Sequence, residues 1–146
     1  MMNLQRIRHV GIVVEDFAQS LFFYRDLLGF EEQLDAMEDS SFIDQVLNLH
    51  GSQLHTMKLA APDGQLIELL DFGPQKERME KRKICSPGPT HFAIQVRDID
   101  AMYQKLSQRG VEFCSEPVLS PDSKVRLAFC RAPEGTWIEM VELVLS

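Results

Sequence analysis

The sequence predicts an α+β protein built from two βαβββ modules, because it repeats one pattern twice. Residues 61–71 return as residues 132–142, and each copy reads Ala-Pro-(Asp/Glu)-Gly followed two residues later by Ile-Glu. Upstream of each copy, the pattern His-x-x-Ile-x-Val-x-Asp begins at His9 and again at His91. Modules of about 60 residues would each be marginal alone. We therefore expect them to share one core within a chain, or to pair across a homodimer.

The first module begins with a strand at residues 7–15, where apolar and β-branched side chains alternate. Asp16 suits a helix N-cap, and Gln19 follows at the spacing of a capping box. Apolar side chains then recur at helical spacing until Gly29, which is suited to end the helix. Three more strands are expected at residues 30–37, 54–60 and 65–72, with a turn at residues 62–64.

The first module also carries an insertion. The two histidines of the repeat are 82 positions apart, whereas Glu68 and Glu139 are 71 positions apart. The first module thus has about 11 extra residues between its His and its Glu, which we place around residues 40–51 as a short helix. Insertions that leave flanking motifs in frame are best tolerated in a surface connection.

The second module repeats the order of elements. A strand at residues 90–97 leads to Asp98 as N-cap of a helix, and Gly110 ends that helix. Further strands are expected at residues 111–118, 125–131 and 136–143, with a turn at residues 133–135. The chain is thus predicted to be one domain, residues 1–146, with modules 5–72 and 89–145 joined by a linker, 73–88.

Composition narrows the class of protein. With 146 residues, 45% hydrophobic and 25% charged, the chain is of ordinary soluble globular type. The net charge of −7 argues against a nucleic-acid partner. No run of 18 apolar residues and no signal peptide is present, so we expect a cytoplasmic protein without membrane attachment. Cys85, Cys114 and Cys130 lack C-x-x-C spacing and indicate structural thiols in a reducing compartment.

In each module, strand parity places the His and the Glu on strand faces that point away from the helices. These residues are His9 and Glu68 in the first module, and His91 and Glu139 in the second. Because side chains at i and i+2 share a face, Ile67 and Ile138 point the opposite way, toward the helices. The residues beside the His and Glu are mostly small or apolar, namely Gly11, Val13, Leu66, Leu70, Ala93, Trp137 and Val141.

Such a face predicts a small-molecule site, since binding pockets are mostly apolar with a few convergent polar groups. A divalent cation would compensate the cost of burying the carboxylates. The four residues are therefore predicted metal ligands at the base of one cavity. His50 and His55 have no counterparts in the second module, and we expect them on the surface or beside the ligands.

These motifs together resemble the vicinal oxygen chelate superfamily, which includes glyoxalase I, methylmalonyl-CoA epimerase, extradiol dioxygenases and bleomycin or fosfomycin resistance proteins. The resemblance covers nearly the whole chain and implies curved sheets around a metal-containing cavity. In glyoxalase I the metal ligands occupy the places of His9, Glu68, His91 and Glu139. All four residue types are present here.

The resemblance also implies an activity. The epimerase usually has Gln where this chain has Glu68, so Glu68 favours a lyase or isomerase resembling glyoxalase I. The cofactor would be a divalent Zn, Ni, Co, Mn or Fe ion. Glu139 would act as base in a 1,2-proton transfer, with Glu68 as the second acid/base candidate. The alternatives are an acyl-CoA epimerase, an iron(II) extradiol-type dioxygenase and a resistance protein that binds a small molecule.

The linker contains a dense basic run at residues 76–83. This run could contact the anionic thiol part of a substrate, such as a glutathione or coenzyme A adduct. A solvated linker face is the alternative interpretation.

Overall fold

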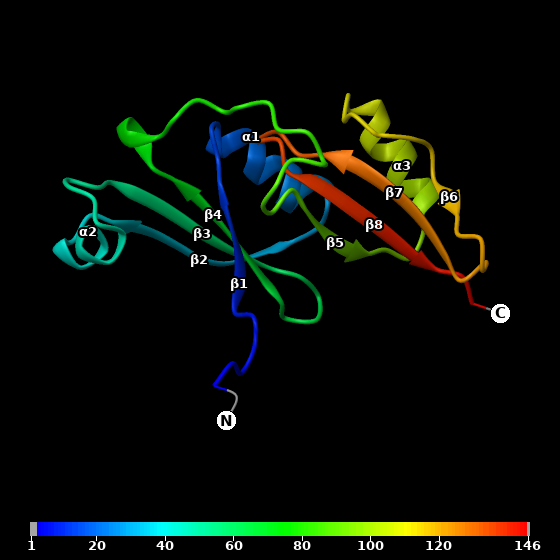
Figure 1. Ribbon diagram of the computed structural model, residues 1–146, viewed down its shortest axis with the longest axis horizontal. Helices are drawn as coiled ribbons and strands as arrows, with labels where there is room; N and C mark the ends of the chain where they lie inside the picture. Colours follow the sequence, from blue (N-terminus) through cyan, green and yellow to red (C-terminus); the bar gives the residue numbers. More distant parts are fainter. Residues whose placement is uncertain (1–2, 146) are drawn as a thin grey trace. The chain divides into compact units, whose positions relative to one another are not determined.

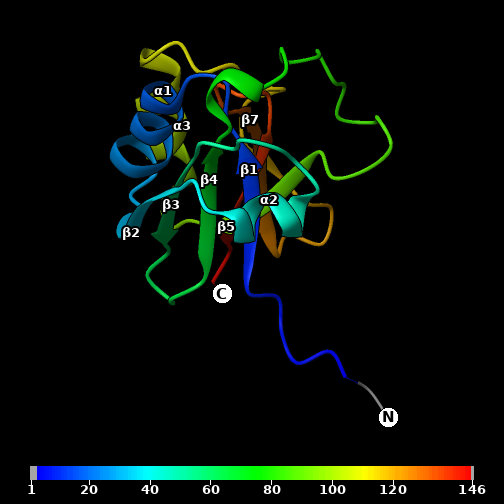
Figure 2. The same ribbon diagram turned by 90° about the vertical axis from the view of Figure 1, so that its left-hand side faces the viewer.

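The computed structural model describes residues 3–145, and the chain divides into two compact units between Met79 and Glu80. This division falls within the predicted linker. Each unit contains one four-stranded mixed sheet with its helices, as Figures 1 and 2 show. The predicted α+β class with two βαβββ modules is therefore confirmed. Among residues 3–145, no helix has the length and hydropathy needed to span a bilayer.

The first unit builds its sheet in the order β1-β4-β3-β2. Strand β1 is parallel to β4, and the other neighbours are antiparallel. The strands are β1 (His9–Val13), β2 (Glu31–Glu38), β3 (Leu54–Ala60) and β4 (Leu66–Asp71). The inserted residues form α2 (Ser41–Leu47) between β2 and β3, as predicted.

The first helix begins at its predicted cap. The Asp16 side chain accepts a hydrogen bond of 3.0 Å from the Gln19 amide, and α1 spans Phe17–Leu21. The helix then widens into the π-helix η1 (Phe22–Leu27), in which the Leu28 amide donates to the Phe23 carbonyl. It ends before Gly29, whose φ of 92° suits a residue without a side chain.

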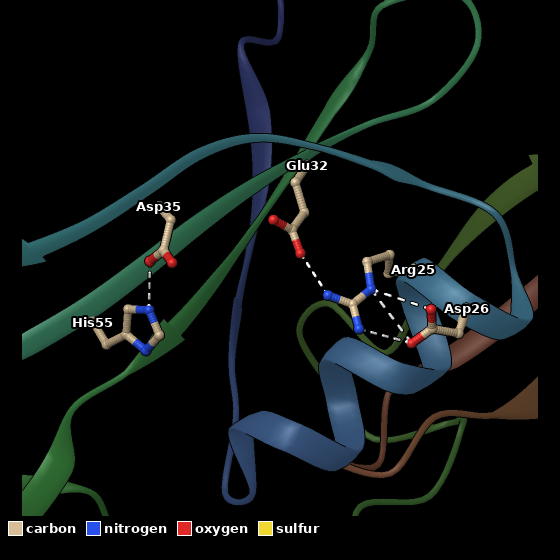
Figure 3. A network of polar contacts seen from close by, with 5 residues as sticks. All are labelled: Arg25, Asp26, Glu32, Asp35 and His55. Atoms are coloured by element: carbon tan, nitrogen blue, oxygen red, sulfur yellow. Dashed lines mark hydrogen bonds and ion pairs between the residues drawn. The ribbon is translucent and has the colours of Figure 1, made fainter.

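Polar pairs connect this helix and the sheet at the surface of the first unit (Figure 3). The Arg25 guanidinium lies between Asp26 and Glu32 and forms ion pairs with both. His55 contacts Asp35 at 2.6 Å and stacks on Phe17, with ring centroids 4.0 Å apart. His55 therefore has partners between helix and sheet, while His50 is exposed.

The second unit repeats this topology with the sheet order β5-β8-β7-β6. Its elements are β5 (His91–Gln95), α3 (Ile99–Gln108), β6 (Val118–Leu119), β7 (Val125–Arg131) and β8 (Trp137–Leu143). Asp98 caps α3 by accepting a 2.9 Å hydrogen bond from the Ala101 amide. Strand β5 is parallel to β8, as β1 is to β4.

The strand predicted at residues 111–118 is wrong in its extent. Before Val118 this segment pairs with β7 through an isolated bridge between Phe113 and Cys130, and regular pairing begins at β6 (Val118–Leu119). Pro117 lies in the gap and has no amide hydrogen to donate to a sheet. The linker contains one 3₁₀ turn, η2 (Gly73–Gln75).

The core of each unit lies between its helices and the inner face of its sheet. Ile12, Ile67 and Leu69 are at most 5% exposed in the first unit. In the second unit, Ile138 and Met140 are fully buried. This burial agrees with the predicted orientation of Ile67 and Ile138 toward the helices, and it leaves the opposite face of each sheet to the His and Glu side chains.

Candidate functional site

Each unit places its His and Glu side by side on adjacent parallel strands. In the first unit, Glu68 of β4 is the register partner of Gly11, two residues beyond His9 on β1. The His9 Nε2 and Glu68 Oε1 atoms lie 3.7 Å apart. Gly11 has no side chain, and the place that its Cβ would take lies 3.3 Å from the Leu70 side chain on the same face.

The second unit repeats this geometry closely. Glu139 of β8 is the register partner of Ala93, two residues beyond His91 on β5. The His91 Nε2 and Glu139 Oε2 atoms lie 3.6 Å apart. The repeat seen in the sequence is thus a repeat of side-chain geometry.

Both distances fit a shared cation better than a hydrogen bond. A hydrogen bond between such atoms is normally 2.7–3.2 Å long. Two ligands bonded to one cation at about 2.1 Å lie about 3.0–3.4 Å apart for octahedral or tetrahedral angles. Small side-chain movements would bring either pair to that spacing, so each pair could supply two ligands to a divalent metal ion.

Each pair alone supplies only two ligands. Among residues 3–145, no three His, Cys, Asp or Glu side chains form a cluster that could hold a metal. The prediction that all four residues share one ion therefore stays a prediction.

The two pairs are half-buried, as a site open to small molecules requires. The side chains of Glu68 and Glu139 are 15% and 22% exposed, and those of His9 and His91 are 34% and 42% exposed. The carboxylates are thus deeper than the imidazoles in both units. This places the negative charges toward the sheet and the ring nitrogens toward its surface.

A neighbouring hydroxyl can orient the ring of His91. Thr90 Oγ1 donates a 3.0 Å hydrogen bond to the Ile84 carbonyl, so its only hydrogen is used. The same oxygen lies 3.5 Å from His91 Nδ1 and can accept from it. A proton on Nδ1 leaves the Nε2 lone pair free for a metal, which is the arrangement that metal-binding histidines usually adopt.

The two His–Glu pairs have different neighbours on the strand that forms a hairpin with the Glu strand. Lys58 of β3 is the register partner of Glu68, and its Nζ lies 3.8 Å from Glu68 Oε2. At the matching place in the second unit, Phe129 of β7 is the register partner of Glu139. The Phe129 ring meets the His91 ring edge to face, at 5.4 Å between centroids. One pair has a cation beside it and the other an aromatic ring.

Lys58 and Phe129 were not among the residues predicted from the sequence, although the sequence contains a signal for both. The turn after Ala60 closes a hairpin in which Ala60 pairs with Leu66, and this register places residue 58 opposite residue 68. Counting back from the second Pro-Glu-Gly turn in the same way would have found Phe129.

The rest of this face in the second unit is mostly apolar, with Gln95 at the end of β5 and the cation Arg131 at the end of β7. Trp137, beside His91, is 8% exposed, and its indole N–H has no hydrogen-bond partner within residues 3–145. The Arg131 guanidinium lies 5.3 Å from the centre of the Trp137 ring. Trp137 and Val141 were both predicted on this face, and their register beside Glu139 agrees with that prediction.

Two cations of the basic run 76–83 have partners within their own units. Lys76 Nζ donates to the Glu15 carbonyl at 2.7 Å and forms an ion pair of 3.2 Å with Asp71. Arg82 donates to the carbonyls of Pro87 and Pro89. These contacts favour a structural role for Lys76 and Arg82.

Comparison with known proteins identifies the family of the chain. The model of the Glyoxalase/Bleomycin resistance protein/Dioxygenase superfamily matches residues 6–140. The Escherichia coli protein YaeR is 32% identical over 146 residues, which covers 97% of this chain and 99% of YaeR. The Arabidopsis thaliana protein Glyoxylase I 4 is 22% identical over 95% of this chain and 71% of its own length.

Solved structures give the same result. The crystal structure of a glyoxalase family protein from Bacillus cereus superposes with a TM-score of 0.89 and is 26% identical. The match covers 99% of this chain and 97% of that protein. The resemblance read from the His and Glu motifs is confirmed, and the chain belongs to the glyoxalase/bleomycin resistance protein/dioxygenase superfamily.

Proposed function

We propose that this protein is a metal-dependent lyase or isomerase resembling glyoxalase I, in which His9, Glu68, His91 and Glu139 hold one divalent cation. The observation that carries the proposal is the duplicated His–Glu pair, with nearly equal spacings of 3.7 and 3.6 Å. Two imidazoles and two carboxylates suit Zn²⁺, Ni²⁺, Co²⁺, Mn²⁺ or Fe²⁺. The modules would meet around this ion within one chain or across a homodimer.

The substrate would be a small molecule with oxygen atoms on adjacent carbons. A divalent cation, when bound, stabilises the negative charge that develops on these oxygens as a neighbouring C–H bond is deprotonated. The apolar residues of the His–Glu faces would exclude water from the carbon skeleton. A thiol adduct of glutathione or coenzyme A is one substrate class of this kind.

Glu139 is the better candidate for the base that moves the proton. Within residues 3–145, the Glu68 carboxylate pairs with both His9 and Lys58, whereas Glu139 pairs with His91 alone. The carboxylate with fewer polar partners can turn more easily toward a substrate. Glu139 would take the proton from one carbon and return it to the adjacent carbon, and Glu68 would keep its partners or serve as the second acid.

Solvent hydrogen exchange tests this proposal. Metal-loaded protein in deuterated water should incorporate deuterium into the hemithioacetal of methylglyoxal and glutathione, or into dihydroxyacetone, without consuming oxygen. Glu139→Gln should retain the metal and lose the exchange by a factor of 10² or more, the scale of general-base catalysis. Undiminished exchange in Glu139→Gln would contradict the role of this residue. Protein that binds no stoichiometric divalent metal would overturn the proposal, and oxygen uptake with catechol would favour a dioxygenase.

A further inference from the structure

Among the described residues, the lysine opposite Glu68 has one polar partner, the Glu68 carboxylate itself. Lys58 Nζ makes an ion pair of 3.8 Å with Glu68, and within residues 3–145 it makes no hydrogen bond. An ammonium group has three donors, and the Lys58 side chain is only 28% exposed. The Lys58 Nζ atom is not among the fully buried unpartnered polar atoms of residues 3–145, so its free donors face solvent and are accessible to a ligand.

Lys76 shows how this chain satisfies a lysine with a structural role. Its side chain is 32% exposed, close to that of Lys58. Its Nζ nevertheless donates to the Glu15 carbonyl at 2.7 Å and pairs with Asp71 at 3.2 Å. Lys58 has a single contact, and at 3.8 Å it is longer than either contact of Lys76. Because the two side chains are similarly exposed, burial does not explain why their numbers of partners differ.

Lys58 also lies on the face that carries His9 and Glu68. Because it is the register partner of Glu68, its side chain leaves the sheet on the same side as that carboxylate. The matching residue in the second unit is the uncharged Phe129. The cation is therefore not a requirement of the repeated scaffold, and it makes the first half of the site different from the second.

We infer that Lys58 binds an oxyanion of the substrate, a carboxylate or a phosphate, next to the oxygens that the metal would hold. This inference rests on the proposed function and narrows its substrate to an anionic class. Lys58 would then determine specificity, since a cation at this place attracts a charged substrate more strongly than a neutral analogue of the same shape. The anion would also fix which end of the substrate lies at Glu68 and which at Glu139.

An isosteric pair of probes tests this inference. Lactate and lactamide have the same shape and adjacent oxygens, but only lactate is charged. Their dissociation constants are to be measured by calorimetry on cobalt-loaded wild type, Lys58→Met and Lys58→Arg. We expect Lys58→Met to weaken lactate binding about tenfold or more and lactamide binding less than twofold. Lys58→Arg should recover most of the loss, and inorganic phosphate should follow lactate if either anion fits.

Lys76→Met is the matched control, because it removes the same charge from the same unit at similar exposure. It should lower stability and leave the ratio of lactate to lactamide affinity unchanged. Cobalt affinity supplies a second readout. Lys58→Met should bind cobalt as tightly as wild type or more tightly, because a positive charge has been removed from beside the ligands.

Two results would overturn the inference and leave the proposed function standing. Equal losses for lactate and lactamide, with weaker cobalt binding, would mean that Lys58 only orients Glu68. Failure of the cobalt-loaded wild type to bind either anion would mean that the site does not accept an oxyanion. Absence of cobalt binding in the wild type would instead contradict the proposed function.

Discussion

Glu139 Oε2 lies 3.6 Å from Nε2 of His91, too far for a good hydrogen bond and close to the spacing of two ligands on one cation. Glu68 and His9 reproduce this relationship within 0.1 Å of the same distance in the other unit, at 3.7 Å. Two separate stretches of chain thus hold the same pair in the same relation, because the same parallel strand pairing supports both.

The hydroxyl beside His91 should tune metal affinity. Thr90→Val removes the oxygen that lies 3.5 Å from His91 Nδ1 and leaves the side-chain shape almost unchanged. We expect divalent metal affinity to fall up to about tenfold, the lower end for partners of ligating histidines. Thr90→Ser keeps the hydroxyl and should bind metal like the wild type. Equal affinities in all three proteins, measured by competition with a chelator, would show that this hydroxyl does not orient the ring.

Adjacent leucines on β4 should differ in their effect on stability. Leu69 is fully buried against the core, whereas Leu70 lies on the face of Glu68 and is partly exposed. Leu69→Ala should lower the free energy of unfolding by about 2–5 kcal/mol. Leu70→Ala should cost less, and Leu143→Ala, at a position 46% exposed, should change little. Urea titrations that rank Leu70 above Leu69 would contradict the assignment of faces.

The three cysteines should react at different rates. Burial raises the pKa of the Cys130 thiol to about 12, and burial with the nearby Glu112 charge raises the pKa of Cys114. A raised pKa leaves less thiolate at a given pH, and the thiolate is the reactive form. At pH 8 a thiol-specific disulfide reagent should modify Cys85 first, Cys114 more slowly and Cys130 only after unfolding. Rapid reaction of three thiols in the native protein would be incompatible with this burial.

The ion pair of Asp100 with Arg126 should make the free energy of unfolding decrease as the pH falls into the acid range. The Arg126 guanidinium donates to both Asp100 oxygens, at 2.6 and 2.8 Å, and thereby lowers the pKa of Asp100. The folded-state pKa is then below the unfolded value of about 3.9. The stabilising contribution is therefore present above that pH and is lost as the pH falls through the folded-state pKa.

Asp100→Asn should flatten the loss of stability on acidification and lower stability slightly at pH 7. Urea unfolding at neutral pH and at successively lower pH measures this slope. The exposed Asp39→Asn serves as the control. Identical slopes in wild type and Asp100→Asn would mean that the pair forms equally in the unfolded chain or not at all in solution.

The sequence predicted the elements best where a turn and a cap bounded them. The ends of β3 were predicted to the residue, because the Pro-Asp-Gly turn fixes the hairpin. The helix after Asp16 was predicted, but its π-helical second half was not. Apolar spacing indicates which side of a helix is buried, whereas the choice between hydrogen-bond partners four or five residues away depends on packing against the sheet. The strand prediction for residues 111–118 was wrong because it relied on the β-forming residues of this segment and neglected Pro117, which cannot donate a backbone hydrogen bond.

The pairing of each His with its Glu was predictable from the sequence, but the surroundings of the two pairs were not. Side chains at i and i+2 of a strand share a face, which was enough to predict the face of His9 on its strand and of Glu68 on its own. Lys58 lies beside Glu68 across a hairpin, and Thr90 lies beside its chain neighbour His91. Finding these two contacts required the strand register and the side-chain positions of the folded units. The fold therefore shows a difference that the repeat does not: Lys58 lies opposite Glu68, whereas Phe129 lies opposite Glu139.

Metal stoichiometry tests the central claim most directly. Equilibrium dialysis of wild type, His9→Ala, His91→Ala and His50→Ala against cobalt would count the ions bound per chain. If the four ligands share one cation, the wild type binds one ion per chain, either His9→Ala or His91→Ala weakens it more than about tenfold, and His50→Ala leaves it unchanged. Two ions per chain in the wild type, with one retained after His9→Ala, would contradict a shared site.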